Sequence, residues 1–178
     1  MNDKDNGQAG EAPVGASATT DAPQAGILGQ YIKDLSFENP NAPETLQQLA
    51  NAKPKIDVNV NVNGRKLNDE VYEVSLSLSA SATHEESSAF VVELVYAGLF
   101  GLKNVPQDQL QPFLLVMAPQ LLFPFARRVI ADATRDGGFP PLMLDPIDFA
   151  GLYRQQLEQA QANATAGGGD TPTPANAN

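Results

Sequence analysis

The clearest pattern in the chain is the strict alternation of apolar and small polar residues over positions 71–83. The apolar positions of this segment are Tyr72, Val74, Leu76, Leu78, Ala80 and Ala82. Because successive side chains of a strand point to opposite faces, the pattern predicts a long strand with one buried and one polar face. The same period of two predicts three further strands, over residues 31–38, 55–63 and 88–97.

Alternation also predicts which side chains share a face. In the first strand, Asp34 and Glu38 lie on the same face as Ile32. The opposite parity holds Tyr31, Leu35 and Phe37. In the fourth strand, Val91 and Glu93 lie opposite the main apolar set. Acidic side chains of both strands are therefore expected on faces that point away from the apolar core.

Glycines follow two of the predicted strands. Gly64 is expected to turn the chain after the second strand, and Gly98 and Gly101 interrupt the pattern of the fourth. Beyond them the spacing of apolar residues changes to three and four, which is the period of a helix. Over residues 119–137 these residues form one stripe: Leu122, Phe123, Ala126, Val129, Ile130 and Ala133.

The boundaries of this central helix follow from proline and glycine. Pro124 fits only near the helix start, because proline donates no backbone N–H. Gly137 and Gly138 predict the end, since glycine accepts the left-handed conformation at a helix C-terminus. A last helix is expected after Asp145-Pro146, an N-cap followed by a proline at the first helical position.

A separate helix is predicted over residues 108–117, with Asp108 as its N-cap. Its run 113–117 is apolar on all sides, whereas the helix of a protein surface keeps a polar face. One small sheet covers only one side of a helix. The sequence therefore predicts that this helix is covered by a subunit interface.

Strands come first and helices second, which predicts an α+β domain with a four-stranded antiparallel sheet and helices on one side. The domain is expected over residues 27–160. Residues 1–26 and 161–178 have almost no bulky apolar side chains, so both are expected to be disordered tails.

Net charge and composition limit the classes of partner that the chain is expected to bind. The formal net charge of −10 disfavours nucleic acid and anionic membranes, which need a basic surface, and favours cationic partners. The N-terminus lacks the apolar core of a secretory signal, and no apolar run approaches the length of a membrane span. The expected location is the cytoplasm.

The residues give little reason to expect catalysis. The single His84 lies in a charged hairpin, and the chain has no cysteine for zinc or thiolate chemistry. Gly167, Gly168 and Gly169 follow no strand, so they do not form a phosphate-binding loop. We therefore expect no enzyme activity, no cofactor and no metal site.

Four separated motifs resemble one known family. They are YIKDLSFE followed by NPNAPETLQ, then DEVYEVSLSLSASA, LLFPFAR and GGFPPLMLDPIDFAGLY. In this order and spacing they resemble SecB, the export chaperone of Gram-negative bacteria, from about Gln30 to Gln159. The resemblance implies a homotetramer, a dimer of dimers with the first long helix packed between two sheets. It also implies ATP-independent binding of unfolded precursors and their delivery to the secretory ATPase SecA.

The resemblance also implies site residues. The SecA-binding site of the family matches here at Asp34, Glu38, Val91 and Glu93. Its client-binding groove matches at Leu121, Phe125, Phe139, Phe149 and Tyr153. Some members carry a tryptophan after NPNAP, where this chain has Ala52 or Lys53, and some carry a more charged C-terminal tail.

Two alternatives stay open from the sequence. One is a SecB-like chaperone dedicated to a single client, such as an antitoxin, and the intact acidic site argues for the general exporter instead. The other is a small enzyme or ligand-binding α+β domain, against which the missing catalytic set argues.

Overall fold

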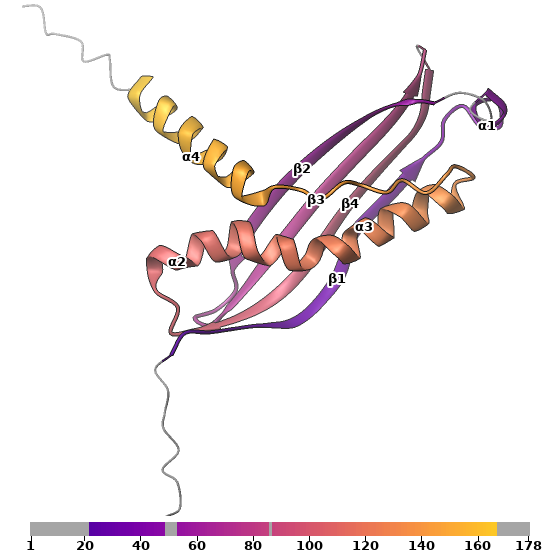
Figure 1. The fold of residues 1–178 in the computed structure, drawn as a ribbon. Helices are drawn as coiled ribbons and strands as arrows, with labels where there is room; N and C mark the ends of the chain where they lie inside the picture. Colours follow the sequence, from indigo (N-terminus) through magenta and orange to yellow (C-terminus); the bar gives the residue numbers. More distant parts are fainter. Residues whose placement is uncertain (1–21, 49–52, 86, 167–178) are drawn as a thin grey trace, which may run out of the picture.

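Four antiparallel strands form the sheet of this computed structural model, which describes residues 22–48, 53–85 and 87–166. They are β1 (Gln24–Glu38), β2 (Lys55–Lys66), β3 (Val71–His84) and β4 (Ser87–Lys103). Their order in the sheet is β1-β4-β3-β2, so β1 and β2 are the two edges (Figure 1). A short helix, α1 (Glu44–Gln48), lies in the connection between the two edge strands. The predicted α+β class, with an antiparallel sheet and helices on one side, is confirmed.

All four strands are longer than predicted, and for β2 and β4 the reason is that glycines do not end them. β2 and β4 continue through Gly64 and Gly98, which lie on the helix-covered face. A Cβ atom added to Gly98 would lie 2.7 Å from a methyl carbon of Leu122, and one on Gly64 would lie 3.3 Å from the Cβ of Leu114. These glycines let the helix approach the sheet closely, so the predicted turn at Gly64 and the predicted interruption at Gly98 are wrong.

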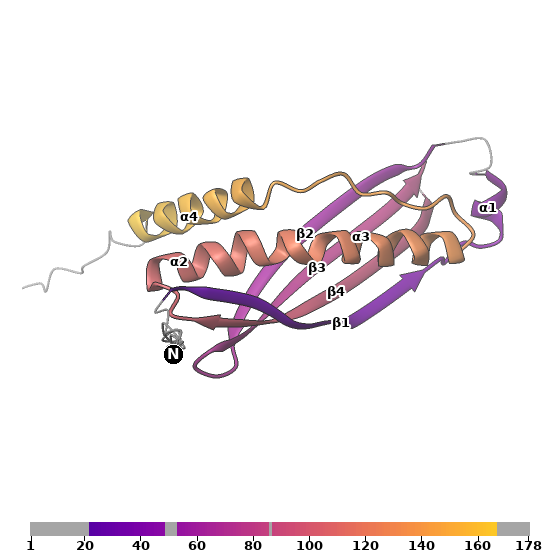
Figure 2. The ribbon, with the colours of Figure 1, turned by 60° about the horizontal axis from the view of Figure 1, so that its bottom comes forward.

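The predicted helices over 108–117 and 119–137 form one continuous helical segment (Figure 1, Figure 2). It comprises α2 (Gln107–Pro112), the π-helical turn η1 (Phe113–Met117) and α3 (Ala118–Asp136). Pro124 lies inside α3, so the expectation that it marks a helix start is wrong. Asp108 is not the N-cap either, because the cap position is Pro106 and makes no side-chain capping bond.

The end of α3 confirms the prediction from its glycines. The amide of Gly137 donates to the carbonyl of Ala133 at 2.9 Å, and that of Phe139 donates to Thr134 at 3.1 Å. Gly138 has a φ of +90°, a conformation that favours glycine. The connection that follows runs back beside α3 towards α4 (Figure 2). The Thr134 hydroxyl anchors it by accepting the Leu142 amide at 2.9 Å.

The last helix, α4 (Phe149–Ala166), begins later and ends later than predicted. Its first turn is capped by Asp148, whose carboxylate accepts the Gly151 amide at 2.9 Å, and not by Asp145. Helical residues extend beyond position 161, and β1 begins at Gln24, so regular secondary structure reaches into both ranges that were predicted to be tails. Residues 1–21 and 167–178 of those tails lie outside the described residues, as does Ala52.

The core lies between the sheet and α3. Alternate residues of β3 and β4 face the buried stripe of the helix, and the largest fully buried members are Phe100, Leu76, Leu78, Leu94, Leu122 and Ile130. The helical segment Gln107–Asp136 is long and apolar enough to span a membrane by length and composition, contrary to the expectation from the sequence. Its apolar character is explained by this packing on the sheet and by an exposed stripe described below.

Candidate binding surfaces

The side of the sheet opposite α3, here called the open face, holds all four residues of the predicted SecA-binding site. In the register of β1 and β4, Glu38 lies opposite Val91, and Ser36 lies opposite Glu93. Asp34, two residues further along β1, is a diagonal neighbour of Glu93. The predicted sharing of one face by these residues is confirmed.

The three carboxylates of this site, Asp34, Glu38 and Glu93, are here called the acidic patch. All three residues are exposed, and within the described part of the chain none of them forms a salt bridge. Val91 beside them is half-buried. An unpaired cluster of one sign on a strand pair can bind a cationic surface, because a partner's cations meet no competing lysine or arginine.

A β-bulge at Lys33 changes part of the predicted parity of β1. The register shifts between Ile32 and Asp34, so Tyr31 lies opposite Ala97 on the open face. Ile32 lies opposite Tyr96 on the helix side. The prediction for these two residues is wrong, because a bulge inserts one residue and reverses the parity before it. Asp34, Ser36 and Glu38 follow the bulge and keep their predicted face.

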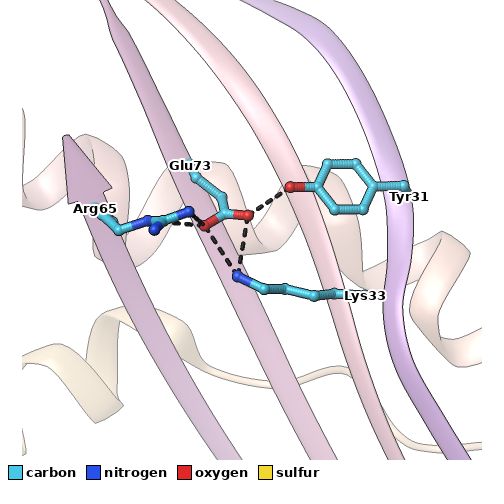
Figure 3. A network of polar contacts seen from close by, with 4 residues as sticks. All are labelled: Tyr31, Lys33, Arg65 and Glu73. Atoms are coloured by element: carbon cyan, nitrogen blue, oxygen red, sulfur yellow. Dashed lines mark hydrogen bonds and ion pairs between the residues drawn. The ribbon is translucent and has the colours of Figure 1, made fainter. Parts of the chain in front are cut away.

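The bulge brings two side chains of β1 to a buried carboxylate on β3 (Figure 3). The Tyr31 hydroxyl donates to Glu73 Oε1 at 2.5 Å, and Lys33 Nζ donates to both carboxylate oxygens at 3.1 Å. From the other side, Arg65 of β2 donates to Oε2 through Nε at 3.1 Å and through a terminal nitrogen at 2.7 Å. The Glu73 side chain is only 4% exposed, whereas those of Lys33 and Arg65 are 44% and 62% exposed.

These contacts stabilise the charged form of Glu73. The hydrogen bond from Tyr31 is the largest cause, and with the bonds from Lys33 and Arg65 it outweighs burial and lowers the pKa of Glu73 to about 2. The same bond, with smaller effects of burial and of the Glu73 charge, raises the pKa of Tyr31. Tyr31 therefore remains a neutral donor and Glu73 an anion across the physiological pH range.

A shallow hollow of about 300 Å³ lies on the open face next to the acidic patch. Asp34 and Glu93 line one side of it, and Asn59 and Asn61 of β2 line the other. Its floor is formed by small or backbone groups of β3 and β4, including Ser77, Ser79 and Val95. The small polar residues of the alternating strand leave room for a partner's side chains between the two edges of the sheet.

The five residues of the predicted client-binding groove do not form one groove. Phe139 and Phe149 are buried in the core, 6% and 1% exposed. They pack against Phe90 and Phe123, with ring centroids 4.9 and 6.1 Å apart. Tyr153 is half-buried, and its hydroxyl donates to Gln111 Oε1 at 3.5 Å.

Leu121 and Phe125, the other two residues of that groove, are exposed on α3. They lie four residues apart and extend a stripe that begins at Met117. The Phe125 ring stacks over Tyr96 at 6.5 Å, and Tyr96 lies opposite Ile32 of the edge strand β1. Exposed apolar residues of helix and strand together form what is here called the β1–α3 surface: Met117, Leu121, Phe125, Ile32 and Leu35.

A cleft of about 780 Å³ lies at the other edge of the sheet, between β2 and α4. Its apolar lining comes from Val58 and Val60 of β2 and from Ile147 and Leu152. The polar lining is Asn59, Asp148, Arg154, Gln155 and Glu158. None of the five groove residues predicted from the sequence lines this β2–α4 cleft. Within the described ranges, no group of three histidine, cysteine or acidic residues could hold a metal ion.

Comparison with known proteins identifies the family. The family model for preprotein translocase subunit SecB matches residues 18–160. The chain belongs to the SecB family of protein-export chaperones. Curated relatives named protein-export protein SecB include one from Maricaulis maris, 56% identical over 83% of this chain and 86% of the relative. A second, from Zymomonas mobilis, is 57% identical over 81% of this chain and 87% of its own.

A solved structure shares the SecB fold at low sequence identity. It is a SecB-like chaperone of Mycobacterium tuberculosis in complex with a peptide from the HigA1 antitoxin. The two chains are 16% identical, with a TM-score of 0.57 over 69% of this chain and 90% of that one. This likeness supports the arrangement of sheet and helices described above.

The sequence predicted the shared face of the acidic patch, but it did not predict two other features of the structure. The first is the group formed by Tyr31, Lys33, Arg65 and Glu73, here called the Glu73 cluster. It depends on the bulge at Lys33, which strict alternation does not reveal. The β2–α4 cleft depends on where α4 lies relative to the edge strand, and the alternating valines Val58 and Val60 were the only signal for it. The alternation of these valines predicts a strand, but it does not show that this strand lies at the edge of the sheet.

Proposed function

We propose that the chain is an ATP-independent holdase that binds unfolded precursors in the cytoplasm and delivers them to SecA. Membership of the SecB family supports the export role. The observation that carries the proposal is the acidic patch, three exposed and unpaired carboxylates beside Val91 on a sheet face that α3 leaves open. No nucleotide is needed in this scheme, because a chaperone that binds only the unfolded state withdraws it from folding by mass action.

The acidic patch is the proposed contact with a cationic surface of SecA. Asp34, Glu38 and Glu93 come from neighbouring strands, so the sheet fixes their spacing. The hollow beside them provides space for side chains of the partner. Complementary charges of this kind raise the association rate and are weakened by salt.

The β2–α4 cleft is the proposed client-binding site. Its apolar residues come from an edge strand and from α4, and its volume of about 780 Å³ can take several side chains of an extended chain. Apolar contact is non-directional, so it selects unfolded segments rather than one sequence. Tyr153 lies on the same helix, while the buried rings of Phe139 and Phe149 support the helix and its approach.

The β1–α3 surface is the proposed subunit interface of a dimer of dimers. It lies at the sheet edge opposite to the β2–α4 cleft, so both can be used at once. An exposed apolar stripe on a long helix next to an edge strand is a surface that a stable soluble protein covers. Leu121 and Phe125 are therefore assigned to assembly rather than to client contact.

Charge reversal of the acidic patch tests the proposed SecA contact. The variant Asp34→Lys/Glu38→Lys/Glu93→Lys should bind purified SecA at least about tenfold more weakly, because each surface pair contributes up to about 1 kcal/mol. Client binding should be unchanged. The matched control is Glu44→Lys/Asp69→Lys/Asp145→Lys, which makes the same charge change at exposed carboxylates outside the patch. Equal affinities of the two variants for SecA would contradict the proposed contact.

The relatives favour the general exporter over a chaperone dedicated to one client. Relatives at 50–57% identity carry the name protein-export protein SecB. The antitoxin-peptide complex is that of a protein only 16% identical to this chain, and it supports the fold alone.

A further inference from the structure

The acidic patch has one cation, Lys33, as a near neighbour, and its side chain is held elsewhere. Lys33 is the bulged residue directly before Asp34 in β1, and its side chain lies on the open face. Arg65 reaches the same face from β2. Both side chains end on Glu73 (Figure 3), which pairs with Leu99 of β4, four residues from the Val95 that lies opposite Asp34.

The position of Glu73 explains why Lys33 does not neutralise the patch. Its carboxylate receives bonds from Lys33 at 3.1 Å on both oxygens and from Arg65 at 2.7 Å. A long, flexible lysine side chain at a bulge can otherwise turn to the adjacent carboxylate of Asp34. Without the anion at position 73, the Lys33 ammonium would be free next to the Asp34 carboxylate.

We propose that Glu73 is a positioning residue that sequesters Lys33 and so keeps the acidic patch unpaired for its cationic partner. This inference rests on the proposed binding of SecA at the patch. Tyr31 contributes by fixing the carboxylate, since its hydroxyl donates to Oε1 from the same strand that carries Asp34. Glu73 itself does not touch the partner, because its side chain is buried under the cations.

Binding of purified SecA to the full chain at low ionic strength, about 0.05 M salt, tests the proposal. Glu73→Gln should weaken binding by roughly threefold to tenfold, because the freed Lys33 competes with the partner's cations. Glu70→Gln makes the same change of net charge at an exposed residue and should leave the affinity within about twofold of wild type. Equal binding by the two variants would overturn the proposal.

Second-site variants separate sequestration from a purely structural role. Glu73→Gln/Lys33→Gln should recover most of the lost affinity, because the competing ammonium is gone. Glu73→Gln/Lys103→Gln has the same net charge but keeps Lys33, so its binding should remain weak. Equal recovery in both would mean that only net charge matters, and recovery in neither would mean that the fold of the face is damaged. Either result overturns the proposal.

A test that retains Glu73 covers the case in which Glu73→Gln does not fold. In the presence of Glu73, Lys33 is already held, so Lys33→Gln and Lys103→Gln should change SecA affinity equally. A larger gain for Lys33→Gln would show that Lys33 already pairs with the patch and would contradict sequestration.

If charge reversal of the acidic patch leaves SecA binding intact, the proposed SecA contact fails. If that reversal abolishes binding while the Glu73 variants behave as wild type, only the sequestration fails.

Discussion

On the open face, the position of single residues determines which charged side chains are paired. A bulge of one residue places Tyr31 and Lys33 over β4 towards Glu73, and the same bulge returns Asp34 to the open face. A buried carboxylate is costly unless its oxygens are paired, and here both oxygens are bonded. The acidic patch and the neutralised cluster thus depend on one irregularity in β1.

The low pKa of Glu73 predicts acid-dependent stability. Its value of about 2 lies below the ordinary 4.5, so its contribution is present in full above pH 4.5 and is lost as the pH falls through about 2. Glu73→Gln should lower the free energy of unfolding near neutral pH by about 1–3 kcal/mol, because bonds to a charged group are lost. Urea unfolding at fixed protein concentration should show that the difference between wild type and variant shrinks across this pH window. A difference that is constant with pH would contradict the assignment.

Secondary-structure elements approach one another closely where glycine allows it. Gly98 lies under α3 on the helix-covered face of β4, with Leu122 above it. Its effect is to let the helix cross a sheet strand without a side chain between them. The position of α3 in turn determines where the β1–α3 surface lies.

Gly98→Ala should destabilise the protein by about 1–3 kcal/mol, because the new methyl group would lie 2.7 Å from a carbon of Leu122. Gly29→Ala on β1 is the matched control, since an added Cβ there meets nothing within 4 Å. That control should be neutral or slightly stabilising. Thermal unfolding at equal protein concentration measures both, and equal melting temperatures would contradict this account of the helix–sheet contact.

The elements could be predicted where a local period decides them. Alternation correctly located the four strands and the shared face of Asp34, Glu38 and Glu93, because both depend only on neighbouring residues. Strand and helix ends were less predictable. Pairing with β3 carries β2 and β4 through Gly64 and Gly98, and packing on the sheet carries the long helix through its prolines.

The binding surfaces were only partly predictable from the sequence. Aromatic residues signal apolar contact but not whether a core or a partner provides it. Phe139 and Phe149 are buried in this chain's own core, whereas Phe125 remains exposed, and their sequence neighbourhoods do not distinguish these cases. The β2–α4 cleft joins β2 to α4, and the Tyr31 and Lys33 contacts to Glu73 join β1 to β3, so both features depend on residues far apart in the sequence.

At the scale of the whole molecule, the proposed assembly surface and the proposed client-binding cleft lie at opposite edges of the sheet. The β1–α3 surface lies at one edge and the β2–α4 cleft at the other, while the acidic patch lies on the open face. With the roles proposed above, three separate surfaces would allow assembly, client binding and SecA binding at the same time. The order of the strands is what separates them.

The proposed assembly predicts that charges in the β1–α3 surface weaken the oligomer. Leu121→Lys/Phe125→Lys should shift the mass from that of a tetramer to that of smaller species, because burying an unpaired charge costs several kcal/mol. The control Ile56→Lys places a charge at an exposed apolar residue of the opposite edge strand and should keep the tetramer. Light scattering at micromolar concentration gives the masses. If both variants remain tetrameric and the first loses client capture, Leu121 and Phe125 belong to the client site after all.

The holdase activity is tested most directly by the refolding of a slow-folding precursor protein without added nucleotide. The chaperone should delay refolding in proportion to its concentration, because it binds only the unfolded state of the client. Val60→Ser/Leu152→Ser in the β2–α4 cleft should weaken this delay while circular dichroism shows an intact fold, since the cleft loses apolar contact area. An unchanged refolding rate in the presence of excess wild-type chaperone would contradict the proposed function.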